Sequence, residues 1–376
     1  MAAAVNTLTP RLQGVTTLNT LYPHLSTTIL HPGPPRDNQP LNAAQSRALA
    51  ALWHYEHGAD TPGSFSEREI QALTQKITWA PTGLYHVASP LIGFVSKSMA
   101  LWVVDEPTTG FRGYAPIHEG SGPTLRFGTP GPTTLALQHW LTDRFQPLMN
   151  TLLTPDGIPL WPIVRTALLM GDDLHMRTQA ASWLLAEEIY RRLAVSSLRH
   201  ELTERDHRFL TRTLWTNPGA FLSIGMAMTE IYFQWWENHA PGDFLIDFGA
   251  NGREWGYRTA GSPSEWVTRL APRPACPNRH PLPISGDSFG LEIMGFGGRI
   301  LPNAPALWEQ LGPERPRAFI PEDNDPSMRE SPIRLPHMPF LLGTRLTELS
   351  HLNMVTGCLD VHDGFLGPGL VTWEDF

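Results

Sequence analysis

The sequence predicts an α+β protein with a helix-rich core around one long broken helix, and with short mixed or antiparallel strands. Two observations support this prediction. Apolar residues recur with helical spacing through residues 161–193. Short apolar runs of strand length gather in clusters between helical segments, whereas a parallel sheet of βαβ units would alternate strands and helices regularly.

Composition limits the classes of function. The 376 residues suffice for one large domain or two ordinary ones, and a hydrophobic content of 41% can fill a sizeable core. The formal net charge is −8 and basic residues form no cluster, so nucleic acid is not expected as a partner. Cys276 and Cys358 are the only cysteines, which argues against a disulfide framework and a cysteine-rich zinc site. A reduced, cytoplasmic location is therefore expected.

The chain carries no sign of a targeting segment or a membrane span. No apolar stretch approaches the length of about 18 residues that a membrane span needs, and the N-terminus lacks the pattern of a signal peptide. Residues 1–25 are weakly patterned and are predicted to form an N-terminal arm. Residues 26–376 are predicted to form a single domain, with a division into two sublobes, residues 26–145 and 146–376, left open.

The first part of the chain begins with a short strand at residues 26–30, which runs into the rigid loop His31-Pro-Gly-Pro-Pro-Arg36. Asn42 and Ser66 are candidate caps of two helices, the second with a capping box. The elements predicted after the loop are helices at 42–56 and 66–77, strands at 100–104, 113–117 and 124–127, and a helix at 133–153.

Residues 161–193 form the segment around which the rest of the chain is organised. Its apolar stripe consists of Val164, Leu168, Leu174, Ala181, Leu185 and Ile189. Gly171 interrupts this stripe. Because a glycine inside a helix costs about 0.5–1 kcal/mol relative to alanine, we expect a kink or a close backbone approach there.

Four charged or titratable residues follow Gly171 directly. Asp172 and His175 are three positions apart, and Asp173 and Arg177 four, so each pair could meet on a helix surface. A carboxylate beside an imidazole can orient it, raise its basicity or share a metal with it. A solvated helix face with ordinary ion pairs explains the same pattern, and both interpretations stay open.

The second part of the chain is predicted to contain a polar helix, a buried helix and a hairpin. The helix at 221–236 is expected to be buried because its apolar residues run almost all round. Asn251-Gly252 is typical of a two-residue turn. The glycine-rich stretch at 286–298 has the spacing of neither a P-loop nor a dinucleotide-binding fingerprint. The remaining predictions are a helix at 200–214, strands at 243–248 and 255–259, irregular chain at 261–283 and 312–336, a short helix at 347–354 and a glycine-rich tail.

Several of these stretches together resemble the YlbE-like family, the large subunits of oxamate carbamoyltransferase. The run Met170-Gly-Asp-Asp-Leu-His-Met-Arg177 is close to the family pattern. The other matching stretches, in family order, are residues 29–35, His118-Glu119-Gly120 with 125–128, 250–256, Gly286-Asp-Ser288 with Glu292 and 295–298, and Thr356-Gly357. No single stretch is specific, but the ordered set from about residue 28 to the end is.

The resemblance implies transfer of a carbamoyl group between carbamoyl phosphate and the nitrogen of oxamate or a related amide. It also implies a multi-subunit complex with an FdrA-like partner, and thus an oligomer with a small-molecule substrate. Such chemistry needs donors for the phosphate and the developing oxyanion, and a group that moves a proton. We hypothesise catalytic roles for His175, Asp172, Asp173 and Glu292. We hypothesise substrate-binding roles for His31, Glu119, Arg126, Arg177, Asn251, Glu254, Asp287 and Ser288.

This hypothesis makes His175 the proton carrier, held by Asp172, with no cofactor and no metal. It expects His175→Ala to keep the fold and to remove most turnover. Ordinary roles stand beside the others: Glu254 could pair with Arg253, and Asp287 could cap a turn, whereas Glu292 in an apolar run requires a buried partner.

The chain departs from the family pattern in three places. The family's N-terminal α/β domain has almost no counterpart, its histidine- and glutamate-rich segment appears here as Pro81–His86, and a C-terminal histidine is replaced near Asp360. We therefore expect a different acceptor. The alternatives left open are a non-catalytic subunit, a carbamoyl or amide hydrolase, and a metal-dependent hydrolase with Asp172 and His175 as ligands.

Overall fold

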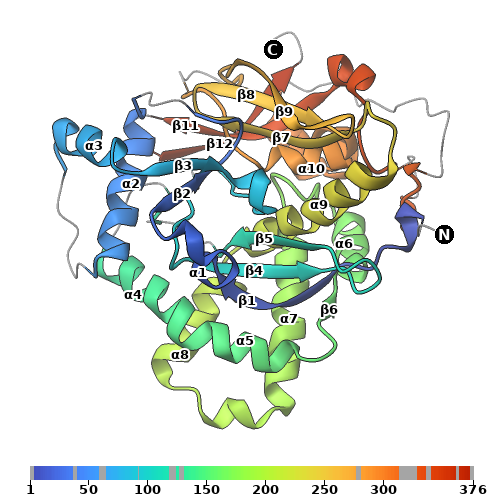
Figure 1. Ribbon diagram of the computed structural model, residues 1–376. Helices are drawn as coiled ribbons and strands as arrows, with labels where there is room; N and C mark the ends of the chain where they lie inside the picture. Colours follow the sequence, from blue (N-terminus) through green and yellow to red (C-terminus); the bar gives the residue numbers. More distant parts are fainter. Residues whose placement is uncertain are drawn as a thin grey trace.

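The computed structural model describes residues 4–36, 40–58, 65–91, 93–117, 124–126, 131–276, 281–312, 328–335, 340–360 and 364–372. The fold is α+β, as predicted, with helices and small sheets mixed through one molecule (Figure 1).

One antiparallel sheet has the strand order β5 (Arg112–Pro116), β4 (Ala100–Asp105), β1 (Arg11–Thr17) and β6 (Ile158–Pro159). The N-terminal arm expected at residues 1–25 is therefore wrong for β1, which is an inner strand paired with both β4 and β6. A bulge between Leu12 and Gly14 breaks the alternation of buried and exposed residues along β1. Because of this irregularity, β1 lacks the regular period-two pattern by which a strand is predicted from sequence.

The second sheet has the strand order β10 (Ser285–Gly286), β7 (Leu245–Asn251), β8 (Glu254–Thr259) and β9 (Ser262–Leu270). The predicted hairpin is confirmed as β7 and β8, and all of β7 is buried. The irregular chain expected from residue 261 is wrong over β9. Pro263 suggested a loop, but a proline near the start of an edge strand is tolerated.

The helix α9 (Ala220–His239) lies between the two sheets, where it packs against β4 and β5 on one side and β7 on the other (Figure 1). Its burial is confirmed: most of its side chains belong to the main hydrophobic core. Because α9 joins the two sheets, a polar residue in its buried part, such as Glu230, lies deep in the molecule.

The capped helices are confirmed as α2 (Ala43–Glu56) and α3 (Glu67–Thr74), each with a capping box at Asn42 or Ser66. The helix predicted at 133–153 is α4 (Pro132–Trp140) and α5 (Gln146–Leu153), joined by a π-helical turn. The remaining helices are α1 (Leu18–Leu21), α6 (Leu160–Leu169), α7 (Gln179–Val195), α8 (Glu204–Leu210), α10 (Phe289–Met294) and α11 (Pro305–Gln310).

Two further strand pairs complete the fold. The parallel pair is β2 (Thr28–His31) with β3 (Thr78–Pro81), and the antiparallel pair is β11 (Asn353–Asp360) with β12 (Gly364–Thr372). The glycine-rich tail thus contains the strand β12. Residues 124–126 are not in a strand, contrary to the prediction.

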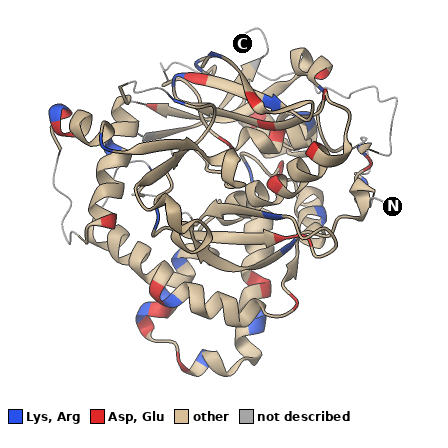
Figure 2. Ribbon diagram, viewed as in Figure 1, with Lys and Arg blue, Asp and Glu red and all other residues tan. Residues whose placement is uncertain are grey.

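The boundary predicted at residues 145/146 falls inside the helical segment of α4 and α5, and a division into two sublobes stays a prediction. In the described ranges, no helix combines the length and the hydropathy needed to cross a membrane. Basic and acidic positions are mixed over the ribbon (Figure 2).

Candidate functional site

The long helix is broken over residues 170–178, between α6 and α7. Gly171 and Leu174 both have positive φ, 91° and 63°. The carboxylate of Asp173 accepts the backbone N–H groups of His175, Met176 and Arg177, which closes the loop around it. The chain here is not helical, so the pairs expected on a helix surface do not form.

The side chains of this loop bind other elements. Asp172 accepts the N–H of Ala181 at the start of α7, and its second oxygen lies 3.6 Å from Arg177 Nε. His175 Nδ1 lies 2.6 Å from Glu292 Oε1 on α10, with both side chains 1% exposed. Burial raises the pKa of Asp172 to about 6.

Glu292 has further partners, because its carboxylate also accepts the N–H groups of Gly298 and Val355. His175 is thus the buried partner that Glu292 requires, and His175 is held by Glu292 instead of by Asp172, as the hypothesis had it. Together these contacts form a buried clamp that ties the loop between α6 and α7 to α10 and β11. Across the described residues, no three His, Cys, Asp or Glu side chains are grouped so that they could hold a metal ion.

Asp287, between β10 and α10, joins three segments that are far apart in the sequence. Its carboxylate accepts the N–H of Gly33, the N–H of Ser89 and the hydroxyl of Thr82. Burial, and next the charge of Asp247, raise the pKa of Asp287 to about 7. The structure therefore brings together the loop after β2, the segment Pro81–His86 and the turn before α10.

Two glycines allow this close approach. Gly33 has φ +74°, and a Cβ there would lie 2.5 Å from the backbone of Ala250. A Cβ on Gly249 would overlap with the carboxylate of Asp287. The glycines of these loops are thus needed for backbone contact, which explains why the loops read as turns in the sequence.

Asn251 fixes the next part of the same junction. Its amide donates to the carbonyl of Pro34 at 3.1 Å, and its side-chain oxygen accepts the N–H groups of Arg253 and Glu254. Gln45 of α2 donates to the backbone carbonyl of Asn251 at 2.5 Å. These contacts shape one wall of a cavity of about 190 Å³, lined by Arg36, Pro40, Leu41, Asn42, Gln45, Asn251, Gly252, Arg253 and Glu254.

Two cationic side chains line this cavity. The guanidinium of Arg36 lies 4.8 Å from the centre of the Trp79 ring, and burial lowers the pKa of Arg36 to about 10, so it stays charged at neutral pH. Arg253 is exposed at the turn between β7 and β8. Among the described residues that line it, the cavity thus offers two positive charges, Arg36 and Arg253, and one carboxylate, Glu254.

His31 lies close to Arg36 and is buried. Its Nδ1 lies 3.0 Å from the carbonyl of Pro32, and a carbonyl can only accept, so Nδ1 carries the proton when the ring is neutral. The other nitrogen, Nε2, is buried and has no hydrogen-bond partner in the part of the chain that the structure describes. Burial lowers the pKa of His31 to about 4. His31 is therefore a neutral imidazole at neutral pH, and its unprotonated nitrogen is enclosed by the protein.

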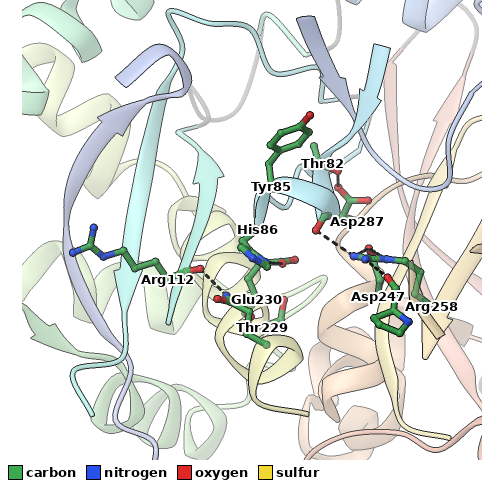
Figure 3. Close-up of polar contacts among 12 residues, drawn as sticks. Thr82, Tyr85, His86, Arg112, Thr229, Glu230, Asp247, Arg258 and Asp287 are labelled. Atoms are coloured by element: carbon green, nitrogen blue, oxygen red, sulfur yellow. Dashed lines mark hydrogen bonds and ion pairs between the residues drawn. The ribbon is translucent and has the colours of Figure 1, made fainter. Parts of the chain in front are cut away.

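An acidic cluster that the sequence did not reveal lies behind Asp287 (Figure 3). Glu230 of α9 and Asp247 of β7 are both buried. Arg258 of β8 lies 2.6 Å from Asp247 and donates to the carbonyl of Gly83. Figure 3 shows Glu230 pointing toward His86, whose Nδ1 is 4.0 Å away. His86 has a left-handed backbone, with φ 52°, and its side chain is 42% exposed.

The charges of this cluster do not balance. Burial, followed by the charges of Asp247 and Asp287, raises the pKa of Glu230 well above its ordinary value, and Arg258 opposes this shift. Burial also raises the pKa of Asp247 despite the arginine. Glu230 could have been noticed in the sequence as a lone carboxylate in an apolar helix, as Glu292 was.

This cluster predicts that stability falls as pH rises from about 5 to 7. The pKa values of Glu230 and Asp287 are raised on folding, so over this range the unfolded chain has lost protons that the folded chain keeps. Each such carboxyl contributes a slope of about 1.4 kcal/mol per pH unit. Urea unfolding at several pH values measures the slope. Glu230→Gln, which cannot ionise, is expected to flatten it, and parallel curves for the two proteins would contradict this explanation.

The other predicted site residues lie apart from the cavity. Arg126 lines a separate small hollow beside α2, with Leu52 and Phe94. Ser288 is buried directly after Asp287. Glu119 lies outside the described residues. His31, Asn251, Glu254 and Asp287 thus gather at one junction, whereas His175, Asp172, Asp173, Arg177 and Glu292 belong to the clamp.

Comparison with known proteins places this arrangement in a family. The family model of the oxamate carbamoyltransferase subunit AllG matches residues 77–281, more than half of the chain. The chain belongs to this family. The matched range includes Pro81–His86, Glu230 and Asn251, while the loop after β2 and Asp287 lie outside it.

Two relatives and one solved structure are similar to this chain. The oxamate carbamoyltransferase subunit AllG of Escherichia coli (strain K12) is 26% identical over 297 residues, which cover 76% of this chain and 68% of that protein. The uncharacterized protein YahG of the same organism is 24% identical, over 92% of this chain and 75% of that protein. A crystal structure of a conserved protein of unknown function from Enterococcus faecalis V583 shares the fold, with a TM-score of 0.79, 20% identity, and coverage of 97% of this chain and 91% of that one.

Proposed function

We propose that this chain is a carbamoyltransferase subunit that binds the phosphate of carbamoyl phosphate in the cavity beside Asn251. Membership of the AllG family supports a role related to carbamoyl transfer. The observation that carries the proposal is the pair of arginines, Arg36 and Arg253, in one cavity at the junction of the family-like loops. The acceptor is an amide or amine other than oxamate. It differs from oxamate in the groups that contact Pro81–His86, the segment in which this chain departs from the family pattern.

The chemistry of the cavity suits a small phosphorylated ligand. Pockets for drug-sized ligands begin at about 300 Å³, so a cavity of about 190 Å³ fits a smaller molecule. Guanidinium groups bind phosphate oxygens through strong charge-assisted hydrogen bonds. The start of α2 at Asn42 and Gln45 adds the positive end of a helix dipole to the same wall.

Transfer also needs a proton acceptor. A bond forms between the acceptor nitrogen and the carbamoyl carbon, the bond from this carbon to the bridging phosphate oxygen breaks, and the acceptor nitrogen loses a proton. We assign His31 Nε2 as the acceptor of this proton, because His31 lies near Arg36 and Nε2 is its unprotonated nitrogen. His175, engaged with Glu292 in the core, is less suited to this role.

Binding of carbamoyl phosphate tests the anion site. We expect Arg253→Gln to raise the dissociation constant in isothermal titration by about tenfold, since a hydrogen bond to a charged group contributes about 1.5–3 kcal/mol and Arg253 is exposed. Arg36→Gln, at a buried position, is expected to have a larger effect. Glu254→Gln removes the opposing charge and is expected to tighten binding.

Arg208→Gln on α8 is the matched control, because it also removes an exposed arginine and its side chain is 70% exposed. Circular dichroism melting shows whether Arg36→Gln keeps its fold. Unchanged titrations for both cavity arginines would contradict the anion site. Retained binding without carbamoyl transfer, even with partner subunits present, would favour the non-catalytic alternative, and release of ammonia without an acceptor would favour a hydrolase.

A further inference from the structure

Two cysteines that are far apart in the sequence come together in the fold. Cys276 and Cys358 are the only cysteines of the chain. Cys358 lies on β11, and Cys276 lies in the chain between β9 and β10. The side chain of Cys276 forms a hydrogen bond with the thiol of Cys358. Two thiols that meet in this way can be joined by a disulfide where the backbone holds them close enough.

Backbone contacts on both sides of Cys276 hold its segment against the strand pair β11 and β12. Directly before it, the N–H of Ala275 donates to the carbonyl of Leu370 at 2.8 Å, and the N–H of Leu370 donates to the carbonyl of Ala275 at 3.2 Å. After it, the N–H of Leu282 donates to the carbonyl of Leu359, the neighbour of Cys358, at 2.7 Å. The meeting of the two thiols thus rests on backbone pairing.

Gly369 of β12 leaves the space in which Cys358 Sγ lies. A Cβ at position 369 would overlap with this sulfur and would lie 2.9 Å from the carbonyl oxygen of Ala275. Because this carbonyl belongs to the peptide bond that joins Ala275 to Cys276, the sulfur lies within the length of a side chain from Cys276. This placement supports the contact between the thiols independently of their hydrogen bond.

The two thiols differ in exposure. Cys276 is partly exposed, whereas Cys358 is fully buried. Burial, and next the hydrogen bond with Cys276, raises the pKa of the Cys358 thiol, which therefore stays protonated at neutral pH. Since a thiol reacts as the thiolate and needs access to its target, Cys276 is the thiol that a dissolved reagent meets first. Cys358 is placed to react with a group already attached to Cys276.

We propose that Cys276 and Cys358 form a reversible redox pair, which closes to a disulfide by exchange with a small disulfide such as oxidised glutathione. The Cys276 thiolate attacks one sulfur of the small disulfide, which breaks its S–S bond and releases one thiolate. Cys358 then gives up its proton and attacks the sulfur of Cys276, which forms the internal S–S bond and releases the second thiolate. The pair loses two electrons and two protons, and the small disulfide gains both as it becomes two thiols.

The internal disulfide would tie the chain before β10 to β11. Asp287 directly follows β10, and β11 donates the N–H of Val355 to Glu292. Oxidation would thus restrict motion between the junction at Asp287 and the clamp at Glu292. This inference does not depend on the carbamoyl chemistry.

Equilibration of the folded protein with reduced and oxidised glutathione tests the pair. We expect the wild type to lose both free thiols together, and mass spectrometry after alkylation to find the peptides of Cys276 and Cys358 linked. Dithiothreitol is expected to restore both thiols. An unfolded chain brings two distant thiols together at roughly millimolar effective concentration, so the equilibrium constant for the internal disulfide is expected to be about tenfold or more larger in the native protein than in concentrated urea.

Single variants separate the roles of the two thiols. Cys358→Ala is expected to stop at a mixed disulfide between Cys276 and glutathione, and Cys276→Ser is expected to leave the buried Cys358 unmodified in the folded protein. The matched control is Cys358→Ala with Ser197→Cys. It keeps two thiols but places the second at an exposed position between α7 and α8, far from β11 (Figure 1), and is expected to form two mixed disulfides.

Three results would overturn the proposal. The first is a folded wild type that forms only mixed disulfides with glutathione. The second is an equilibrium constant no larger in the native protein than in urea. The third is a control variant that closes an internal disulfide as readily as the wild type.

Discussion

Asp287→Ala is expected to lower the free energy of unfolding by about 2 kcal/mol or more, since it leaves two donors without an acceptor and each buried unsatisfied donor costs about 1–3 kcal/mol. These donors are the N–H groups of Gly33 and Ser89, whereas the hydroxyl of Thr82 can still donate to the carbonyl of His31. Relief of the buried carboxyl offsets part of this loss, because its raised pKa already records a penalty on the charged form. The measurement is urea unfolding at pH 7.

The control for this prediction is Asp243→Ala. Asp243 is 36% exposed and lies 3.9 Å from Arg345, and such surface pairs contribute about 0–1 kcal/mol. Asp287→Ala is also expected to weaken carbamoyl phosphate binding, since the loop carrying Arg36 is held to the sheet through Gly33. Equal unfolding midpoints for the two variants would show that Asp287 does not hold the three segments together.

The sequence predicted that the broken helix and the glycine turns would meet around one pocket, and the structure divides this set. His31, Asn251, Glu254 and Asp287 gather at the junction because glycines there permit direct backbone contact. His175 lies with Glu292 in the clamp. Asp287 lies just before α10 and Glu292 lies within it, so the two residues are about 7–8 Å apart along the helix axis. The roles of both groups in chemistry stay predictions.

The local elements were predictable where local chemistry decides them. Asn42 and Ser66 begin their helices through side-chain caps, and Asn251-Gly252 turns the hairpin, as their residue types indicate. The pairing of Asp247 with Arg258 could also have been inferred, since the hairpin register places them opposite one another. A break at Gly171 was expected, but the length of the loop that follows was not, because its apolar positions keep a helical spacing while Asp173 binds the backbone.

The strands β1 and β9 were missed for a different reason. A bulge removes the regular alternation from β1, and its place in the sheet depends on β4, more than eighty residues later in the chain. In β9 both faces are largely exposed, so no apolar face marks the strand. Tertiary pairing decides both, and pairing between distant segments leaves little trace in a single sequence.

His175→Ala is expected to destabilise the protein by about 1.5–3 kcal/mol, because it removes the hydrogen bond between His175 and the buried carboxylate of Glu292 and leaves this charge with only the N–H groups of Gly298 and Val355. Adding Glu292→Gln to this variant removes that charge and is expected to recover part of the loss, which a double-mutant cycle from urea unfolding measures. His207→Ala, at an exposed position on α8, is the control. The hypothesis that His175 carries the proton predicts the opposite result, in which the fold stays intact and turnover is lost. A wild-type unfolding midpoint for His175→Ala would therefore refute the clamp and return His175 to the candidates for catalysis. Lost stability, with turnover retained in the folded fraction, would instead support His31 as the proton acceptor.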